Sequence, residues 1–236
     1  MAGIGLLETH GLTRHFGGLR AVEAVDFTLH AGQIHALIGP NGAGKTTFVG
    51  LLCGRVPVQA GTIHFDGQDI THMPAHLRVR AGIAYTFQIT SIFRGLSVFD
   101  NVALAAQRPN QHDLGAATEH ILHQVGLESQ INQQADTLSY GHQRLLEIAM
   151  GLALRPRLLI LDEPTQGLSN AEITGFKALV RAIVPKTTVL LIEHNMDVVM
   201  DLADQITVLN MGETLATGTP ATIQANPAVQ SAYLGG

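Results

Sequence analysis

The sequence predicts an α/β fold in which a helical insert interrupts a mainly parallel β-sheet. Short, near-continuous apolar segments are typical of strands covered on both faces, and they occur at 34–38, 157–162, 187–193 and 205–210. Helical patterns alternate with these segments, which favours parallel strands joined by crossover helices. Between residues 95 and 155 the strand pattern stops and helical patterns dominate, so the insert is placed there.

Turn and cap signals define the elements of the first two thirds of the chain. Alternating polar and apolar residues predict strands over 26–30 and 61–67. A helix is expected after a glycine-rich loop, from about Thr46 to Cys53. The insert carries three helical patterns, at roughly 97–106, 115–126 and 139–154.

N-cap signals place further helices in the last third. Ser169, with Glu172 three residues later, begins one helix, and another is expected after His194. Two Thr-Pro or Asn-Pro pairs, at 219–220 and 226–227, have the pattern of an N-cap followed by a first-turn proline, which predicts two short helices.

Composition limits the class of protein. The 236 residues are 46% hydrophobic, which supports one globular domain with a sizeable core. A net charge of −5 argues against a nucleic-acid partner. Neither a signal peptide nor an apolar run of the roughly 18 residues that a membrane span needs is visible, so work at a membrane would require another chain. Cys53 is the only cysteine, which excludes an intrachain disulfide.

The segment GPNGAGKT, residues 39–46, fits the phosphate-loop pattern G-x-x-x-x-G-K-[ST] between a strand and a helix. Glycines let backbone N–H groups turn toward phosphate oxygens, and the helix N-terminus adds positive partial charge. Lys45 is expected to reach the β- and γ-phosphates, and the Thr46 hydroxyl to ligate Mg²⁺. The predicted nucleotide contacts are Gly39, Pro40, Asn41, Gly42, Ala43, Gly44, Lys45, Thr46 and Thr47.

Two acids stand at the end of the apolar strand at 157–162: Asp162 is its last residue and Glu163 follows it. A strand end in an open parallel sheet lies beside the phosphate loop. We expect Asp162 to hold Mg²⁺ and Glu163 to be the base that polarises an attacking water. The second acid favours hydrolysis over simple nucleotide binding, since binding needs only the metal ligand.

Residues 138–168, LSYGHQRLLEIAMGLALRPRLLILDEPTQGL, resemble the signature-to-Walker-B block of ATP-binding cassette (ABC) ATPases, and the resemblance covers essentially the whole chain. It implies a P-loop NTPase (RecA-like) fold with an N-terminal antiparallel β-subdomain and a helical subdomain. The core would then comprise about 1–88 and 156–236, and the helical subdomain about 89–155.

The resemblance also implies a partner chain. In the family, the signature binds the γ-phosphate of ATP held on the phosphate loop of a second subunit. The resemblance implies the same role for the residues that begin the helix after Leu138. The Ser139 hydroxyl and the amides at the N-terminus of that helix form an anion site. Two chains would therefore sandwich two ATP molecules head to tail, with signature contacts from Ser139, Tyr140, Gly141 and His142.

Three other positions match family motifs. Phe16 stands where an aromatic ring stacks on adenine, although a core phenylalanine is the alternative. Gln88 matches the Q-loop, which touches Mg²⁺ or water and couples to the transport channel. His194 matches the switch histidine that contacts the γ-phosphate, with a merely structural histidine at a strand end as the alternative.

Stretches such as FGGLRAVEAVDF and the closing NPAVQSAYLG resemble the ATPase subunits of branched-chain amino-acid importers and their relatives for urea or aromatic acids. The expected partners are a second ABC ATPase subunit, identical or paralogous, integral membrane permease subunits and, indirectly, a solute-binding protein outside the membrane. The implied location is the cytoplasmic face of the inner or plasma membrane, reached through the permease.

Two departures from the family pattern bear on the signature and the loop after Glu163. Tyr140 fits the importer subgroup, whereas His142 replaces the usual glutamine and could make affinity depend on pH. Ser169 stands where many relatives have Asp and this subgroup often has Asn. The resemblance therefore does not imply the hydrogen bond that the family makes across the interface at this position.

Three other functions compete with transport. A non-transport ABC ATPase usually carries a long coiled-coil insert or a second cassette, and the sequence has neither. A nucleotide sensor without turnover would not need Glu163 and His194. A P-loop kinase or GTPase would leave the signature block unexplained, and no N-K-x-D guanine motif is present.

Overall fold

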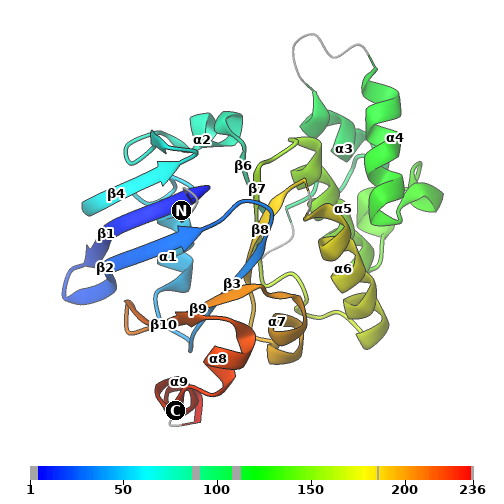
Figure 1. The fold of residues 1–236 in the computed structure, drawn as a ribbon. Helices are drawn as coiled ribbons and strands as arrows, with labels where there is room; N and C mark the ends of the chain where they lie inside the picture. Colours follow the sequence, from blue (N-terminus) through cyan, green and yellow to red (C-terminus); the bar gives the residue numbers. More distant parts are fainter. Residues whose placement is uncertain (1–4, 87–90, 108–112, 185, 235–236) are drawn as a thin grey trace.

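The computed structural model describes residues 5–86, 91–107, 113–184 and 186–234, and their strands form two β-sheets (Figure 1). The smaller sheet is antiparallel and consists of β1 (Leu7–Phe16), β2 (Leu19–Leu29), β4 (Ala60–Phe65) and β5 (Gln68–Asp69), in the order β2-β1-β4-β5. The larger sheet consists of β3 (Ile34–Ile38), β6 (Ile83–Thr86), β7 (Leu158–Asp162), β8 (Thr188–Ile192), β9 (Gln205–Asn210) and β10 (Glu213–Gly218), in the order β10-β9-β3-β8-β7-β6. All its strands are parallel except β10, which pairs antiparallel with β9.

Helices connect and cover these strands. They are α1 (Lys45–Leu52), α2 (Ala75–Ala81), α3 (Val98–Ala106), α4 (Leu114–Val125), α5 (Tyr140–Ala153), α6 (Asn170–Ile183), α7 (Met196–Leu202), α8 (Pro220–Gln224) and α9 (Pro227–Leu234), with 3₁₀ turns η1 (Glu128–Gln130) and η2 (Ala135–Thr137). Within the described residues, every helix is too short or too polar to cross a bilayer.

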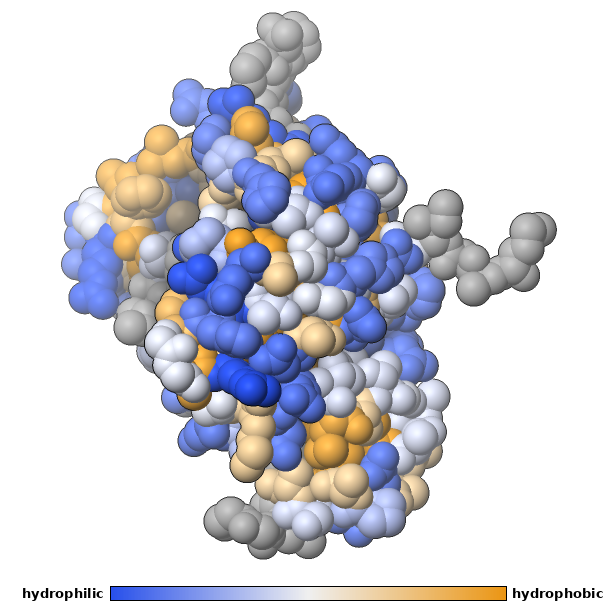
Figure 2. All heavy atoms as spheres, turned by 90° about the vertical axis from the view of Figure 1, so that its left-hand side faces the viewer, coloured by the Kyte–Doolittle hydropathy of each residue, from blue (hydrophilic) through white to orange (hydrophobic). Residues whose placement is uncertain are grey.

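The larger sheet separates two hydrophobic cores. Leu158 and Ile160 of β7 pack with α1 and the smaller sheet, whereas Leu159 and Leu161 pack with α3, α4, α5 and α6 on the other face. Figure 1 shows α1 and α5 on opposite sides of the larger sheet accordingly. The outward face of the smaller sheet is mainly hydrophilic, with scattered apolar patches (Figure 2). That sheet is therefore covered on one face only, as its alternating burial requires.

Most of the predicted elements are confirmed. Strands β2, β3, β4, β7, β8 and β9 overlap the expected segments, as do helices α1 and α3 to α9, although β2 begins at Leu19 and β4 ends at Phe65. The sequence did not reveal β1, β5, β6, β10 and α2. Register shifts between Thr9 and Leu12 break the alternation of β1, and β6 is only four residues long, so neither has a clear period.

Arg78 of α2 fixes the C-terminal end of α1. Its side chain is only 2% exposed, and Nη1 donates to the carbonyls of Leu51 at 2.7 Å and Leu52 at 2.8 Å. Nε donates to the Met73 carbonyl and Nη2 to the Thr71 carbonyl. The last carbonyls of a helix have no intrahelical partner, so Arg78 supplies the donors that α1 lacks.

Replacing Arg78 should destabilise the fold without touching the phosphate loop. We expect Arg78→Met to lower the free energy of unfolding by roughly 2–4 kcal/mol, because buried carbonyls lose a charged donor. Urea denaturation followed by circular dichroism measures this. Arg80→Met, on the exposed side of the same helix, is the matched control and should change the value by less than about 0.5 kcal/mol. Equal changes in the two variants would contradict the assignment.

His35 of β3 is a buried histidine between the two sheets. It is 1% exposed, its ring lies 4.7 Å from the Phe27 ring between centroids, and its Nε2 lies 2.8 Å from Thr207 Oγ1. Burial, assisted by the charge of His30, lowers the pKa of His35 to about 4. The imidazole is therefore neutral in the folded protein at neutral pH.

Acid should destabilise the fold through His35. The unfolded chain takes up this proton near pH 6.5 and the folded chain only near pH 4. The contribution of neutral His35 to the free energy of unfolding is therefore fully present above pH 6.5 and falls by roughly 3 kcal/mol as the pH drops to about 4. In His35→Gln, which cannot titrate, the free energy of unfolding should lose this component of its pH dependence. Urea titrations across that range test it, and parallel curves for wild type and variant would refute it.

Candidate functional site

The phosphate loop occupies the turn between β3 and α1. A Cβ on Gly39, whose φ is 154°, would lie 2.2 Å from the Leu209 carbonyl oxygen. A Cβ on Gly44, whose φ is 101°, would lie 2.1 Å from the Ala21 carbonyl oxygen. The loop is thus wedged between β9 and β2, and only glycine fits at either end.

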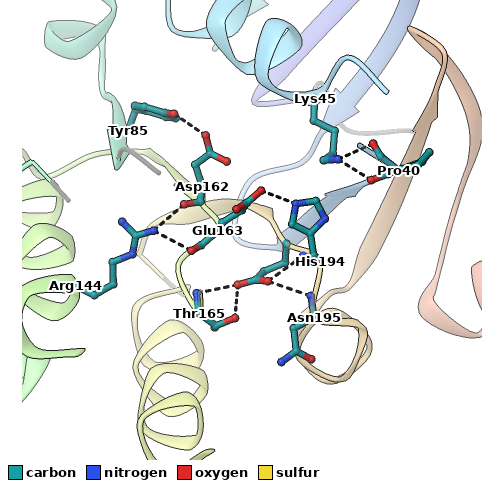
Figure 3. Close-up of polar contacts among 11 residues, drawn as sticks. Pro40, Lys45, Tyr85, Arg144, Asp162, Glu163, Thr165, His194 and Asn195 are labelled. Carbon is teal, nitrogen blue, oxygen red and sulfur yellow. Dashed lines mark hydrogen bonds and ion pairs between the residues drawn. The ribbon is translucent and has the colours of Figure 1, made fainter. Parts of the chain in front are cut away.

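Lys45 lies at the first position of α1 with its amine directed back to the loop. Nζ donates to the carbonyls of Gly39 at 2.6 Å and Pro40 at 3.0 Å (Figure 3). Burial lowers the pKa of Lys45, and the carboxylates of Glu163 and Asp162 act in the opposite direction. The carbonyls of the loop and the charges of the two acids therefore hold the Lys45 ammonium group beside the phosphate loop.

A cleft of about 320 Å³ opens in front of the loop. It brings together parts of the chain that are far apart in sequence, because Glu163 and His194 face the loop residues across it. Its full lining is Leu19, Ala21, Asn41, Gly42, Ala43, Gly44, Lys45, Thr46, Thr47, Glu163 and His194.

Glu163 and His194 are in direct contact. Glu163 follows β7 with a φ of 48°, a strained left-handed conformation for a side chain, and its amide donates to the Ile192 carbonyl at 2.9 Å. His194 Nε2 lies 2.5 Å from Glu163 Oε1 (Figure 3). The predicted base and the predicted switch histidine therefore form one unit at the edge of the cleft.

Asp162, the last residue of β7, is held from two sides. Tyr85 Oη donates to Asp162 Oδ2 at 2.6 Å, and Arg55 lies over the Tyr85 ring with Cζ 4.3 Å from its centroid. Burial raises the pKa of Asp162, and the hydrogen bond from Tyr85 opposes that rise. Arg144 Nη2 donates to the carbonyls of Asp162 at 3.1 Å and Glu163 at 2.9 Å.

Sequence reasoning missed two residues that contact the acids, namely Tyr85 and Arg144. Arg144 of α5 also forms a buried ion pair with Glu147 at 2.7 Å. A buried charge needs such partners, so an arginine on the apolar face of a predicted helix was the one available signal. No local pattern marks Tyr85.

The signature residues lie on the other side of the larger sheet from α1. Ser139 is the N-cap of α5, and its Oγ accepts from the His142 amide at 3.2 Å. A Cβ on Gly141 would lie 2.0 Å from Glu172 Oε1, so the helix start packs closely on α6. Ser139 and Tyr140 are exposed, and none of the four predicted signature residues lines the cleft.

Phe16 ends β1 and is 46% exposed, with the Arg14 Cζ 4.7 Å from its ring centroid. It is not among the cleft-lining residues, whereas Leu19 of the same hairpin is. Gln88 lies outside the described residues.

Known proteins are similar to this chain in both sequence and fold. Residues 22–166 match the family model described as ABC transporter, and residues 213–236 match the model described as branched-chain amino acid ATP-binding cassette transporter. The chain is 40% identical to the high-affinity branched-chain amino acid transport ATP-binding protein BraF of Pseudomonas aeruginosa, over 98% of both chains. It is 39% identical to the corresponding protein LivG of Escherichia coli K12, again over 98% of both.

Solved structures agree with these relatives. An ATP-binding cassette of an ABC transporter in its ADP conformation superposes with a TM-score of 0.89 and 25% identity, over 99% of this chain and 100% of the other. A nucleotide-free cassette superposes with a TM-score of 0.88, over 97% and 98% of the two chains. The predicted phosphate loop, the acids after β7 and the α/β fold thus coincide with matches over nearly the whole sequence, and the chain belongs to the ABC transporter family as one of its ATP-binding ATPase subunits.

Proposed function

We propose that this subunit hydrolyses ATP in the cleft to power import of branched-chain amino acids. The observation that carries the proposal is the Glu163–His194 pair facing Lys45 and Thr46 across one cleft. A phosphate cradle and a base in one cleft suit hydrolysis, whereas a nucleotide sensor would need the cradle alone. The names of the relatives and of the C-terminal family model support the substrate class.

The residues that would border a bound triphosphate offer ligands that suit Mg²⁺. Thr46 offers a hydroxyl at the start of α1 and Asp162 a carboxylate at the end of β7, and oxygen donors of this kind are those that Mg²⁺ prefers. Among the described residues no three His, Cys, Asp or Glu side chains form a metal cluster, so the remaining ligands would be phosphate oxygens and water. When bound, the ion neutralises charge on the phosphates. Gln88 is kept as a further proposed contact.

The chemistry assigned to the chain is proton transfer and charge stabilisation. Glu163 accepts a proton from the water whose oxygen attacks the γ-phosphorus, while the bond to the β–γ bridging oxygen breaks and ADP leaves. His194, in contact with Glu163, orients that carboxylate and contacts the γ-phosphate. Lys45 and the loop amides hold the other phosphate oxygens.

A second chain is proposed to complete each site. Ser139 and Tyr140 stand exposed at the start of α5, and none of the four signature residues lines the cleft of their own chain. An N-terminal helix turn with a serine hydroxyl is suited to binding a phosphate anion. Two chains arranged head to tail would bring the signature of each to the nucleotide of the other, and release of phosphate would let them separate.

Contact with a permease is proposed at the apolar surface near α3. Phe93 and Leu104 are large exposed apolar side chains, and a hollow of about 300 Å³ is lined there by Leu96, Asp100, Ala103, Leu104, Gln107 and Leu114. Exposed apolar patches of this kind mark protein interfaces. Through this surface the subunit would be held at the cytoplasmic face of the membrane.

Removing the proposed base should abolish transport and hydrolysis but spare binding. Glu163→Gln should lower the rate of phosphate release by roughly 10²–10⁴-fold with ATP affinity kept, and should accumulate an ATP-bound dimer on size exclusion. In vesicles carrying the complete transporter, wild type should drive uptake of labelled leucine, and the variant should not.

Glu128→Gln, at an exposed position of η1, is the matched control and should behave as wild type. Normal phosphate release by Glu163→Gln would contradict the assigned base. Uptake of labelled urea in place of leucine would contradict the substrate class and leave the ATPase assignment intact.

The signature serine should act between chains. Ser139→Ala should weaken ATP-dependent dimerisation by about tenfold, because a donor to the partner's phosphate is lost, while ATP affinity of the single chain stays within about twofold. Analytical ultracentrifugation in the Glu163→Gln background measures dimerisation. Ser97→Ala removes the equivalent N-cap of α3 and controls for helix capping. If both serine variants weakened the dimer equally, the role in trans would be rejected.

A further inference from the structure

Glu193 is a buried acid that the proposed chemistry does not use. It follows β8 and is 3% exposed. Its two carboxylate oxygens accept hydrogen bonds from different loops. Oε1 accepts from the Thr165 amide at 2.9 Å and the Thr165 hydroxyl at 2.5 Å. Oε2 accepts from the amides of His194 at 3.0 Å and Asn195 at 3.2 Å.

These two loops are the ones that carry the proposed machinery. Thr165 lies two residues beyond Glu163 in the loop after β7, and His194 lies in the loop after β8. The strands are parallel neighbours with Asp162 opposite Ile192, so their loops leave the sheet side by side. Thr165 and Asn195, which donate to Glu193 from the two loops, lie below the Glu163–His194 contact in Figure 3.

We propose that Glu193 is a positioning residue that links the two loops and thereby fixes the contact between Glu163 and His194. A carboxylate suits this place because both of its oxygens accept and neither donates, so each loop can donate to its own oxygen. The inference rests on the proposed function, since Glu163 and His194 are assigned their roles there. It adds a buried residue that acts through the two loops it is hydrogen-bonded to.

Single-atom changes to Thr165 test the link with little disturbance. Thr165→Val has nearly the same shape but loses the hydroxyl donor, and it should lower kcat for phosphate release about tenfold while ATP affinity changes less than about twofold. Thr165→Ser restores the hydroxyl and should bring kcat within about threefold of wild type. In Glu193→Gln an NH₂ group replaces one acceptor and faces N–H donors, so the loss of kcat should be at least as large as in Thr165→Val.

Thr187→Val is the matched control. The Thr187 hydroxyl donates to the Pro156 carbonyl at 3.2 Å, a buried hydrogen bond that joins the opposite ends of the same two strands. This variant should lose stability as Thr165→Val does, measured by thermal unfolding, and keep its kcat. Equal loss of kcat in the two valine variants, or none in Thr165→Val, would overturn the inference, and this comparison decides even if Glu193→Gln fails to fold.

Glu163→Gln separates this inference from the proposed function. If wild type and Glu163→Gln released phosphate equally, the proposed function would fail. If Glu163→Gln were inactive while Thr165→Val kept full activity, only the role of Glu193 would fail.

Discussion

The site depends on one constraint, the parallel register of β3, β8 and β7. Leu37 of β3 lies opposite Ile192 of β8, and Ile192 lies opposite Asp162 of β7. Parallel strands end at the same edge of a sheet, so the loops that follow them emerge together. That register sets the phosphate loop, Glu163 and His194 around one cleft, although more than a hundred residues separate the loop from the other two. The glycines at the two ends of the loop, Gly39 and Gly44, then allow β9 and β2 to pack closely against the loop.

The charges at this edge of the sheet explain why the phosphate loop and the two acids suit a site that also binds a cation. Lys45 is the lysine of the cleft, and Asp162 and Glu163 are close enough to influence its pKa. Two carboxylates beside a triphosphate repel it, and a divalent cation relieves that repulsion. Asp162 is the proposed ligand of such a cation, and it could bind one while keeping the protein's own hydrogen bonds, because Tyr85 engages one oxygen of its carboxylate and Arg144 engages its backbone carbonyl.

Local patterns predicted most of the fold and the motifs of the site, and long-range partners account for what was missed. The phosphate loop is a continuous motif, and β3 is an apolar run, interrupted only by His35, whose limits match the expected 34–38. Tyr85 meets its partner 77 residues away, and Glu193 meets Thr165 28 residues away, so no spacing marks either. The adenine role of Phe16 remains a prediction, since its ring lies outside the cleft lining.

The unusual residues of the signature and of the loop after β7 meet within one chain. Ser169 caps α6 in a capping box with Glu172, and Glu172 faces Gly141 at the start of α5. The Ser169 amide is the main cause of the lowered pKa of Glu172, and the charge of His142 acts in the same direction. A Cβ on Gly167 would also lie 3.0 Å from the Tyr140 ring. The signature and the segment after Glu163 are therefore packed as one unit. In the proposed two-chain arrangement, a partner's nucleotide that pulled on the signature would act directly on the loop that carries the proposed base.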